Sequence, residues 1–189
     1  SADAGVGVVV MRGVGGKAFV AGTDIEQFKT FSSGDDGVAY ESKVEVYVDK
    51  VERLPMPTLA VVEGWAVGGG MALANACDFR IATPGARFGV PIARTLGNCL
   101  SAANLKRLTD TLGVPVVKRM LLLADMMPAE DLLPLGYLLA ITPPEDLDAH
   151  VAELCERLLG HAPVTMRVTK EALRRLGAAT TVDDADLIH

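Results

Sequence analysis

The chain has 189 residues, of which 50% are hydrophobic, and a formal net charge of −6. This length suits one domain with a buried core, and the acidic balance argues against a nucleic-acid partner. No apolar run is long enough for a membrane helix and no signal-peptide pattern is present, so we expect a cytoplasmic protein without a membrane partner.

The cysteines and histidines point to no metal or disulfide chemistry. Cys77, Cys99 and Cys155 are an odd number without pair spacing, and the three histidines are scattered near the C-terminus. Such a pattern is typical of reduced thiols that serve as small buried side chains. We therefore expect no metal site.

The first part of the chain reads as a strand followed by helices. A buried strand is predicted at residues 7–11 and a short helix at 25–31. A polar loop is expected at 32–37. Apolar residues three or four positions apart then predict a helix over 38–54, which Pro55 ends.

The strongest local signals lie in the middle of the chain. Two apolar strands are predicted at 58–62 and 79–83, with three consecutive glycines at 68–70 and a helix at 71–76 between them. Glycine lets a ligand approach the backbone, and the amides that open a helix attract negative charge. The cluster therefore suits an anion or a developing oxyanion, although a tight strand-to-helix turn explains it equally well.

Beyond these strands the patterns are mostly helical. Gly113 is expected to end one helix and Pro115 to begin the next, and apolar residues of the last helix, such as Val164 and Val168, are candidates for a subunit contact. The expected elements are helices at 101–112 and from 115 onward, a helix at 129–135, a strand at 137–141, and helices at 145–159 and 163–176.

Three motifs occur in a fixed order. Residues 18–25 read AFVAGTDI, residues 57–78 hold a proline-led strand, GWAVGGG and a final Cys-Asp pair, and residues 88–91 read FGVP. Together they resemble the crotonase superfamily, the enoyl-CoA hydratase/isomerase family, over nearly the whole chain. Each motif alone is weak, but the shared order and spacing make the combination specific.

The resemblance implies an α/β fold, the ClpP/crotonase-like spiral of strand-strand-helix turns with C-terminal helices. Residues 1–125 would form the spiral core that binds acyl-CoA, and residues 126–189 a helical trimerisation region, in a homotrimer or homohexamer. The segment with which the family usually begins has no counterpart in this sequence. We therefore expect a truncated N-terminus and a coenzyme A site that lacks part of its lining.

The resemblance also assigns a site. The family holds the thioester oxygen of an acyl-CoA between two backbone amides, here those of Thr23 and Gly69, and needs no cofactor besides its coenzyme A thioester substrate. When the thioester becomes an enolate, each fixed amide lowers the barrier by roughly 3 kcal/mol. The residues expected to line the substrate are Ala21, Gly22, Asp24, Ile25, Gly68, Gly70, Ile92, Arg94 and Asn98.

Two positions depart from the family pattern. Hydratases carry one glutamate two residues after the glycines and another after the proline of the third motif, where this chain has Ala72 and Ile92. A positioned acid or base contributes roughly 10²- to 10⁴-fold, so ordinary hydration is doubtful. This leaves enolate chemistry with another acid/base group, a different reaction of the superfamily, or a non-catalytic protein that binds acyl-CoA.

Each of the other polar residues near the motifs allows a functional and a structural interpretation. Asp24 is better explained as a helix cap than as an acid/base group. Arg94 suits a substrate carboxylate and Asn98 a bound water, but both also suit loop-structuring roles. Arg12 and Lys17 lie near the first motif, where they are either contacts for the coenzyme phosphates or solvated side chains.

Overall fold

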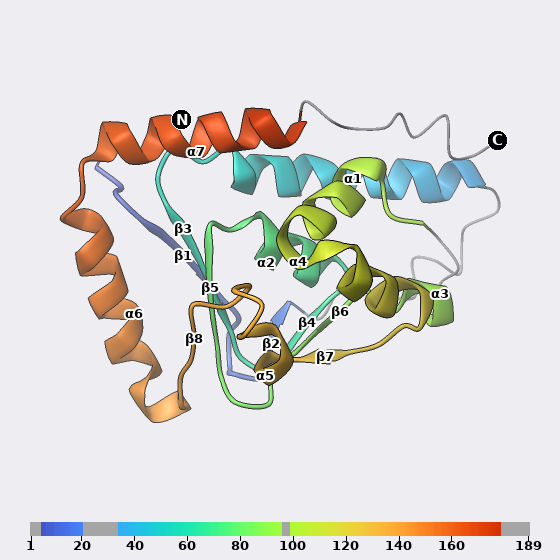
Figure 1. Cartoon of the computed structure of the whole chain (residues 1–189), viewed down its shortest axis with the longest axis horizontal. Helices are drawn as coiled ribbons and strands as arrows, with labels where there is room; N and C mark the ends of the chain where they lie inside the picture. Colours follow the sequence, from blue (N-terminus) through green and yellow to red (C-terminus); the bar gives the residue numbers. More distant parts are fainter. Residues whose placement is uncertain (1–4, 21–33, 96–98, 179–189) are drawn as a thin grey trace.

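The computed structural model describes residues 5–20, 34–95 and 99–178 (Figure 1). Predicted helices and strands agree with it over most of that range. The elements are β1 (Val9–Arg12), β2 (Ala18–Val20), α1 (Gly34–Glu52), β3 (Thr58–Val62), β4 (Trp65–Val67), α2 (Gly69–Ala76), β5 (Phe79–Ala82), β6 (Arg87–Gly89), α3 (Ile92–Thr95), α4 (Ala102–Leu122), β7 (Met127–Pro128), α5 (Ala129–Leu132), β8 (Ala140–Ile141), α6 (Pro144–Leu159) and α7 (Pro163–Ala178).

Two four-stranded sheets form the centre of the molecule. One has the order β1-β3-β5-β8 and the other β2-β4-β6-β7, so successive strands from β1 to β6 alternate between the two sheets. All pairs are parallel except β6 with β7. Each turn of the chain thus adds one strand to each sheet, which confirms the predicted spiral of strand-strand-helix turns.

The position of a strand in its sheet decides how far it is buried. All five residues of β3 are buried, as expected for an inner parallel strand that is covered on both faces. The prediction that residues 7–11 form a buried strand is wrong in its burial, because β1 is an edge strand and Val10 is 41% exposed. Strand β7 pairs with β6, and β8 pairs with β5, so the sheets include strands beyond residue 125.

The division of the chain at residue 125 into a spiral core and a trimerisation region stays a prediction.

The helix boundaries follow local chemistry. Helix α1 already begins at Gly34, so the loop predicted at 32–37 is wrong for residues 34–37. Helix α4 continues through Gly113, whose backbone is not helical (φ 74°, ψ 153°), and Pro115 follows at the start of the second half. The predicted break between two helices is therefore confirmed as a kink.

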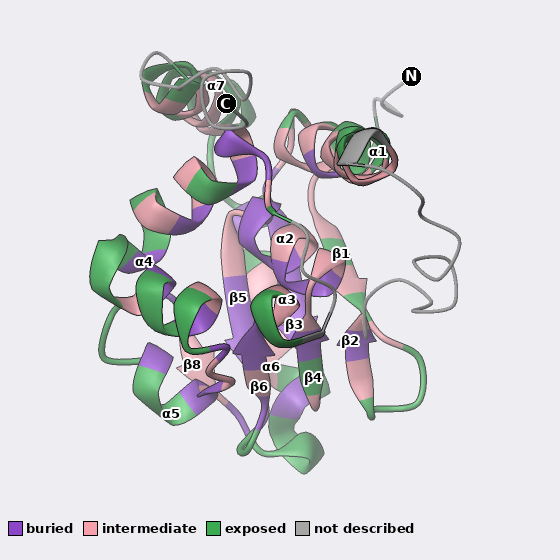
Figure 2. Ribbon diagram, turned by 90° about the vertical axis from the view of Figure 1, so that its right-hand side faces the viewer, coloured by how far each residue is buried: buried purple, intermediate pink, exposed green. Residues whose placement is uncertain are grey.

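The short helix α2 lies at the middle of the packing. It contacts β4, α1 and α4, and its Met71 and Ala74 are fully buried. Figure 2 shows the buried residues gathered in the sheets and α2, whereas α1 and α7 lie at the outside. Contacts that hold α2 in place therefore also hold the glycine turn at its N-terminus.

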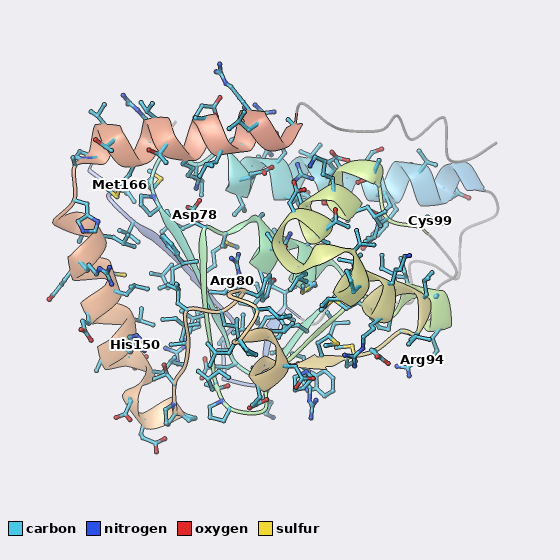
Figure 3. All side chains as sticks on the ribbon, in the orientation of Figure 1. Asp78, Arg80, Arg94, Cys99, His150 and Met166 are labelled. Atoms are coloured by element: carbon cyan, nitrogen blue, oxygen red, sulfur yellow. The ribbon has the colours of Figure 1, made fainter. Side chains whose placement is uncertain are left out.

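Arg80 of β5 holds the C-terminal end of α2 from inside the core. The side chain is only 8% exposed and lies near the centre of the molecule (Figure 3). Its Nη1 donates to the carbonyls of Ala74 and Cys77 at 3.2 and 2.6 Å, and its Nε donates to the carbonyl of Tyr137 at 2.8 Å. A cation at a helix C-terminus satisfies the last carbonyls and the dipole together.

None of the residues of helix α7 is buried, and a lysine links the helix to the core. Lys170 Nζ donates to Asp78 Oδ2 at 2.6 Å and to the carbonyl of Met56 at 3.2 Å. The same carboxylate oxygen accepts from the amide and the hydroxyl of Thr58 at 2.7 and 2.9 Å. The exposed apolar residues of α7, including Val164 and Val168, leave the predicted subunit contact untested. Within the described ranges, no helix is both long and apolar enough to span a membrane.

We predict that Lys170→Met lowers the free energy of unfolding by about 1–3 kcal/mol, because it leaves the partly buried Asp78 carboxylate with one donor group fewer. Arg175→Met on the same helix is the matched control. Arg175 pairs with Glu171 at the surface, with side chains 75% and 40% exposed, and such pairs contribute little. Urea denaturation measures both, and equal losses would contradict the role assigned to Lys170.

Candidate active site

The glycine turn is clamped between β6 and α2. Gly68 precedes the helix with φ 55° and ψ −118°, a conformation that favours glycine, and no side chain caps the helix there. Its amide donates to the carbonyl of Gly89 at 3.0 Å, and its own carbonyl accepts from the amide of Ala72 at 3.1 Å. The turn is thus fixed from both sides, and Gly69 is the first residue of α2.

The amide of Gly69 has the properties that an oxyanion donor needs. As the first N–H of a helix it has no intrahelical acceptor, and it carries part of the positive end of the helix dipole. A Cβ added at Gly69 would meet no atom of the described residues within 4 Å. The helix itself therefore leaves this amide available to a ligand oxygen.

Gly70 is needed for a different reason. A Cβ added there would lie 2.0 Å from the carbonyl oxygen of Val20, the last residue of β2. The end of β2 therefore runs directly beside the glycine turn. The chain that continues from Val20 carries the remainder of the first motif. Its predicted site residues lie outside the described residues, as does Asn98; they are Ala21, Gly22, Thr23, Asp24 and Ile25.

A small pocket opens beside the glycine turn, with room for about one water molecule. Ala72, at the first of the two glutamate positions, forms part of its wall. Ile92, at the second position, is partly buried and packs on the core from α3. The pocket is lined by Gly68, Ala72, Asn75, Val90, Leu100, Asn104, Arg107 and Leu108. No carboxylate is among these described residues.

Sequence analysis missed the polar side chains of this pocket. Asn75 Oδ1 accepts from Thr111 Oγ1 at 2.8 Å, and Arg107 donates to Glu52 Oε2 at 2.9 Å and to Asn104 Oδ1 at 3.1 Å. A signal was present, because Asn104 shares one helical face with the buried Leu108 and Leu112. A polar residue in such an apolar stripe indicates a specific partner.

The two arginines that sequence analysis singled out lie elsewhere. Arg94 is exposed on α3 and lies at the edge of the molecule (Figure 3), so its predicted contact with substrate stays a prediction. Arg12 Nε donates to Glu63 at 2.6 Å and its Nη1 also pairs with Asp148. These hydrogen bonds hold the pKa of Arg12 above its usual value and weigh against a role on coenzyme phosphates.

Buried titratable groups near α2 are structural. Burial raises the pKa of the Cys77 thiol to about 11, so it is protonated and inert at neutral pH. Burial also raises the pKa of the Tyr137 hydroxyl, whose ring lies edge-on to Phe88 at 5.7 Å. The expectation of buried cysteines is confirmed for Cys77 and wrong for Cys99, which is exposed in the loop before α4.

We predict that Gly70→Ala lowers the free energy of unfolding by about 1–3 kcal/mol or more, because its methyl group meets the Val20 backbone. Gly69→Ala, one residue away, should melt close to the unmodified protein because its methyl group enters open space. Thermal denaturation of both variants tests this difference. Equal melting temperatures would show that β2 does not pack against the turn as described.

Comparison with known proteins places this chain in a family. The family model for enoyl-CoA hydratase/isomerase matches residues 1–185. A short-chain-enoyl-CoA hydratase from Clostridium acetobutylicum is 31% identical over 97% of this chain and 69% of its own length. The crystal structure of an enoyl-CoA hydratase/carnithine racemase from Magnetospirillum magneticum has 32% identity and a TM-score of 0.87, covering 98% of this chain and 70% of that one.

A structure named for a different reaction is also similar. A methylmalonyl-CoA decarboxylase in complex with 2-nitronate-propionyl-CoA has 26% identity and a TM-score of 0.86, covering 96% of this chain and 69% of that one. The similar proteins thus include hydratases and a decarboxylase, each named for a coenzyme A thioester. The fold, the glycine turn and the family match agree, and this chain belongs to the enoyl-CoA hydratase/isomerase family of the crotonase superfamily.

Proposed function

We propose that this protein binds an acyl-CoA and stabilises the enolate of its thioester between the amides of Thr23 and Gly69. The observation that carries the proposal is the Gly69 amide, which is the first N–H of a largely buried helix and has no acceptor within that helix. Support for Thr23 comes from the family match and from the end of β2, which lies beside Gly70. No resident cofactor is required, because coenzyme A enters with the substrate.

The chemistry follows from where charge develops. Removal of a proton from the α-carbon, or addition of a nucleophile at the β-carbon, leaves an electron pair that delocalises onto the thioester oxygen. The Gly69 amide is fixed at the start of α2 beside β6. Together with the Thr23 amide it would stabilise that oxygen, each amide by roughly 3 kcal/mol. The reaction class is that of a lyase or isomerase. Ordinary hydration is disfavoured, because Ala72 and Ile92 supply no acid or base.

A second candidate function is a non-catalytic protein that holds acyl-CoA. The absence of a carboxylate among the described residues of the pocket favours it. Both candidates share the ligand, and both agree with a cytoplasmic homotrimer or homohexamer. The exposed apolar face of α7 supports an oligomer, with Leu173 63% and Leu176 71% exposed.

We predict that Gly69→Pro lowers the rate of α-proton exchange of butyryl-CoA in deuterated water by about 10²- to 10³-fold relative to Gly69→Ala, the range for one lost oxyanion donor. Proline removes the N–H and is well tolerated at the first position of a helix, whereas alanine keeps the N–H. Proton NMR measures exchange, and circular dichroism checks the fold.

The same spectra separate the two candidate functions. Exchange in the unmodified protein supports an enzyme, and equal exchange rates in the two Gly69 variants would overturn the role of this amide. If ligand lines broaden without exchange, the protein holds acyl-CoA without turning it over. If neither occurs, the acyl-CoA proposal itself is wrong.

We predict that Ala72→Glu combined with Ile92→Glu raises hydration of crotonyl-CoA, by up to about 10²- to 10⁴-fold, because it restores the two carboxylates to an otherwise competent scaffold. The Ile92 change removes a core contact, so the melting temperature should fall. Loss of absorbance of the conjugated thioester follows the reaction. A folded double variant without any gain would mean that the site serves a different reaction.

A further inference from the structure

One polar group in the pocket lacks a partner. Asn104 is 3% exposed and lines the pocket, and its Nδ2 makes no hydrogen bond among the described residues. The orientation of the amide is fixed, because Oδ1 accepts from Arg107 Nη1 at 3.1 Å and a guanidinium can only donate. The group left over is therefore a donor. Buried donors in native proteins almost always find an acceptor.

The local backbone holds this donor in place. Ser101 caps α4, with its Oγ accepting from the Asn104 amide at 3.2 Å, so Asn104 lies in the first turn of the helix. Arg107, one turn further on, ties Oδ1 to Glu52 of α1. The side chain is thus positioned by two helices and by its own helix cap. Such an amide is pre-organised to recognise one acceptor.

The charge of the pocket decides which acceptor fits. Arg107 is the only cation among the described residues of its wall, and it lies 2.9 Å from Glu52 and 3.9 Å from Glu45. Its charge is therefore already balanced, and the unpaired donor is a neutral amide. A carboxylate would gain little from such surroundings, whereas a neutral oxygen needs only one donor. An N–H group that donates to a water oxygen makes that water less nucleophilic. The Asn104 amide therefore does not replace the two missing glutamates as a base.

We propose that Asn104 is a specificity residue which donates from Nδ2 to a neutral carbonyl oxygen of the acyl group beyond the thioester. This inference rests on the proposed function, because the pocket adjoins the glycine turn through Gly68 and Ala72. Alanine at residue 72 leaves the space that the oxygen enters. The preferred ligands are then oxo-acyl-CoA thioesters rather than simple saturated ones.

The test compares two ligands that differ by one oxygen. Acetoacetyl-CoA and butyryl-CoA have the same chain length, and the additional keto oxygen can only accept a hydrogen bond. In the unmodified protein, acetoacetyl-CoA should bind roughly threefold to tenfold more tightly, the range of one net hydrogen bond. Asn104→Asp keeps the oxygen that faces Arg107 and replaces the donor with an acceptor. The ratio of the two Kd values, that of butyryl-CoA divided by that of acetoacetyl-CoA, should therefore fall to one or below.

Two further variants keep the test decisive. Lys106→Gln is the control on the same helix. Lys106 pairs with Asp110 outside the pocket, so this variant should keep the Kd ratio of the unmodified protein. Ala72→Val fills the pocket without touching the donor and should lower the ratio even if Asn104→Asp does not fold. Isothermal titration calorimetry measures all the Kd values.

The outcomes distinguish failure of the Asn104 subsite from failure of acyl-CoA binding. Equal binding of the two ligands by the unmodified protein, or an unchanged ratio in folded Asn104→Asp, would overturn the subsite and leave acyl-CoA binding intact. Tighter binding of malonyl-CoA than of acetoacetyl-CoA would overturn the assignment of a neutral oxygen. If neither acetoacetyl-CoA nor butyryl-CoA binds, the proposed function fails and the subsite fails with it.

Discussion

The site depends first on a buried cation. Arg80 reaches from a central strand to the last carbonyls of α2 and to the carbonyl of Tyr137, and its guanidinium lies 4.5 Å from the centre of the Tyr137 ring. Burial of a charge is costly unless hydrogen bonds compensate for it, and here the acceptors are the carbonyls that a helix end leaves unpaired. The arrangement anchors one end of α2 in the core. The opposite end, which carries Gly69, then has little freedom to move.

The glycine turn completes this constraint from the other side. Gly70 lets the end of β2 pass so closely that even a methyl group would not fit, while the Gly68 amide is held by β6. Neighbouring residues therefore differ, because a Cβ at Gly70 would meet the β2 backbone whereas one at Gly69 would meet no described atom within 4 Å. A motif of three identical residues thus serves three different purposes: a turn at Gly68, the first N–H of the helix at Gly69 and a close backbone contact at Gly70.

The sequence was most informative where local chemistry determines structure. The apolar run of β3 and the break at Gly113 with Pro115 were predicted from local patterns, whereas the spiral and the family were predicted from the resemblance that the three motifs carry. Burial was harder to predict, because the edge position of β1 and the exposure of Cys99 depend on which segments become neighbours. Asn104 was missed for a related reason: its unpaired donor exists only once Arg107 has taken its oxygen. The assignment of Thr23 and its neighbours in the first motif to the site rests on the resemblance.

The way in which α7 is attached has a consequence for the dynamics of the fold. Central strands such as β3 are covered on both faces, and their amides should exchange with solvent only when the whole protein unfolds. Helix α7 buries none of its residues, and the Lys170 contact with Asp78 links it to a loop beside β5. It should therefore behave as a separate unit that opens locally and exchanges first. A partner that covers its apolar face would slow that opening, so protection of α7 amides would report assembly directly.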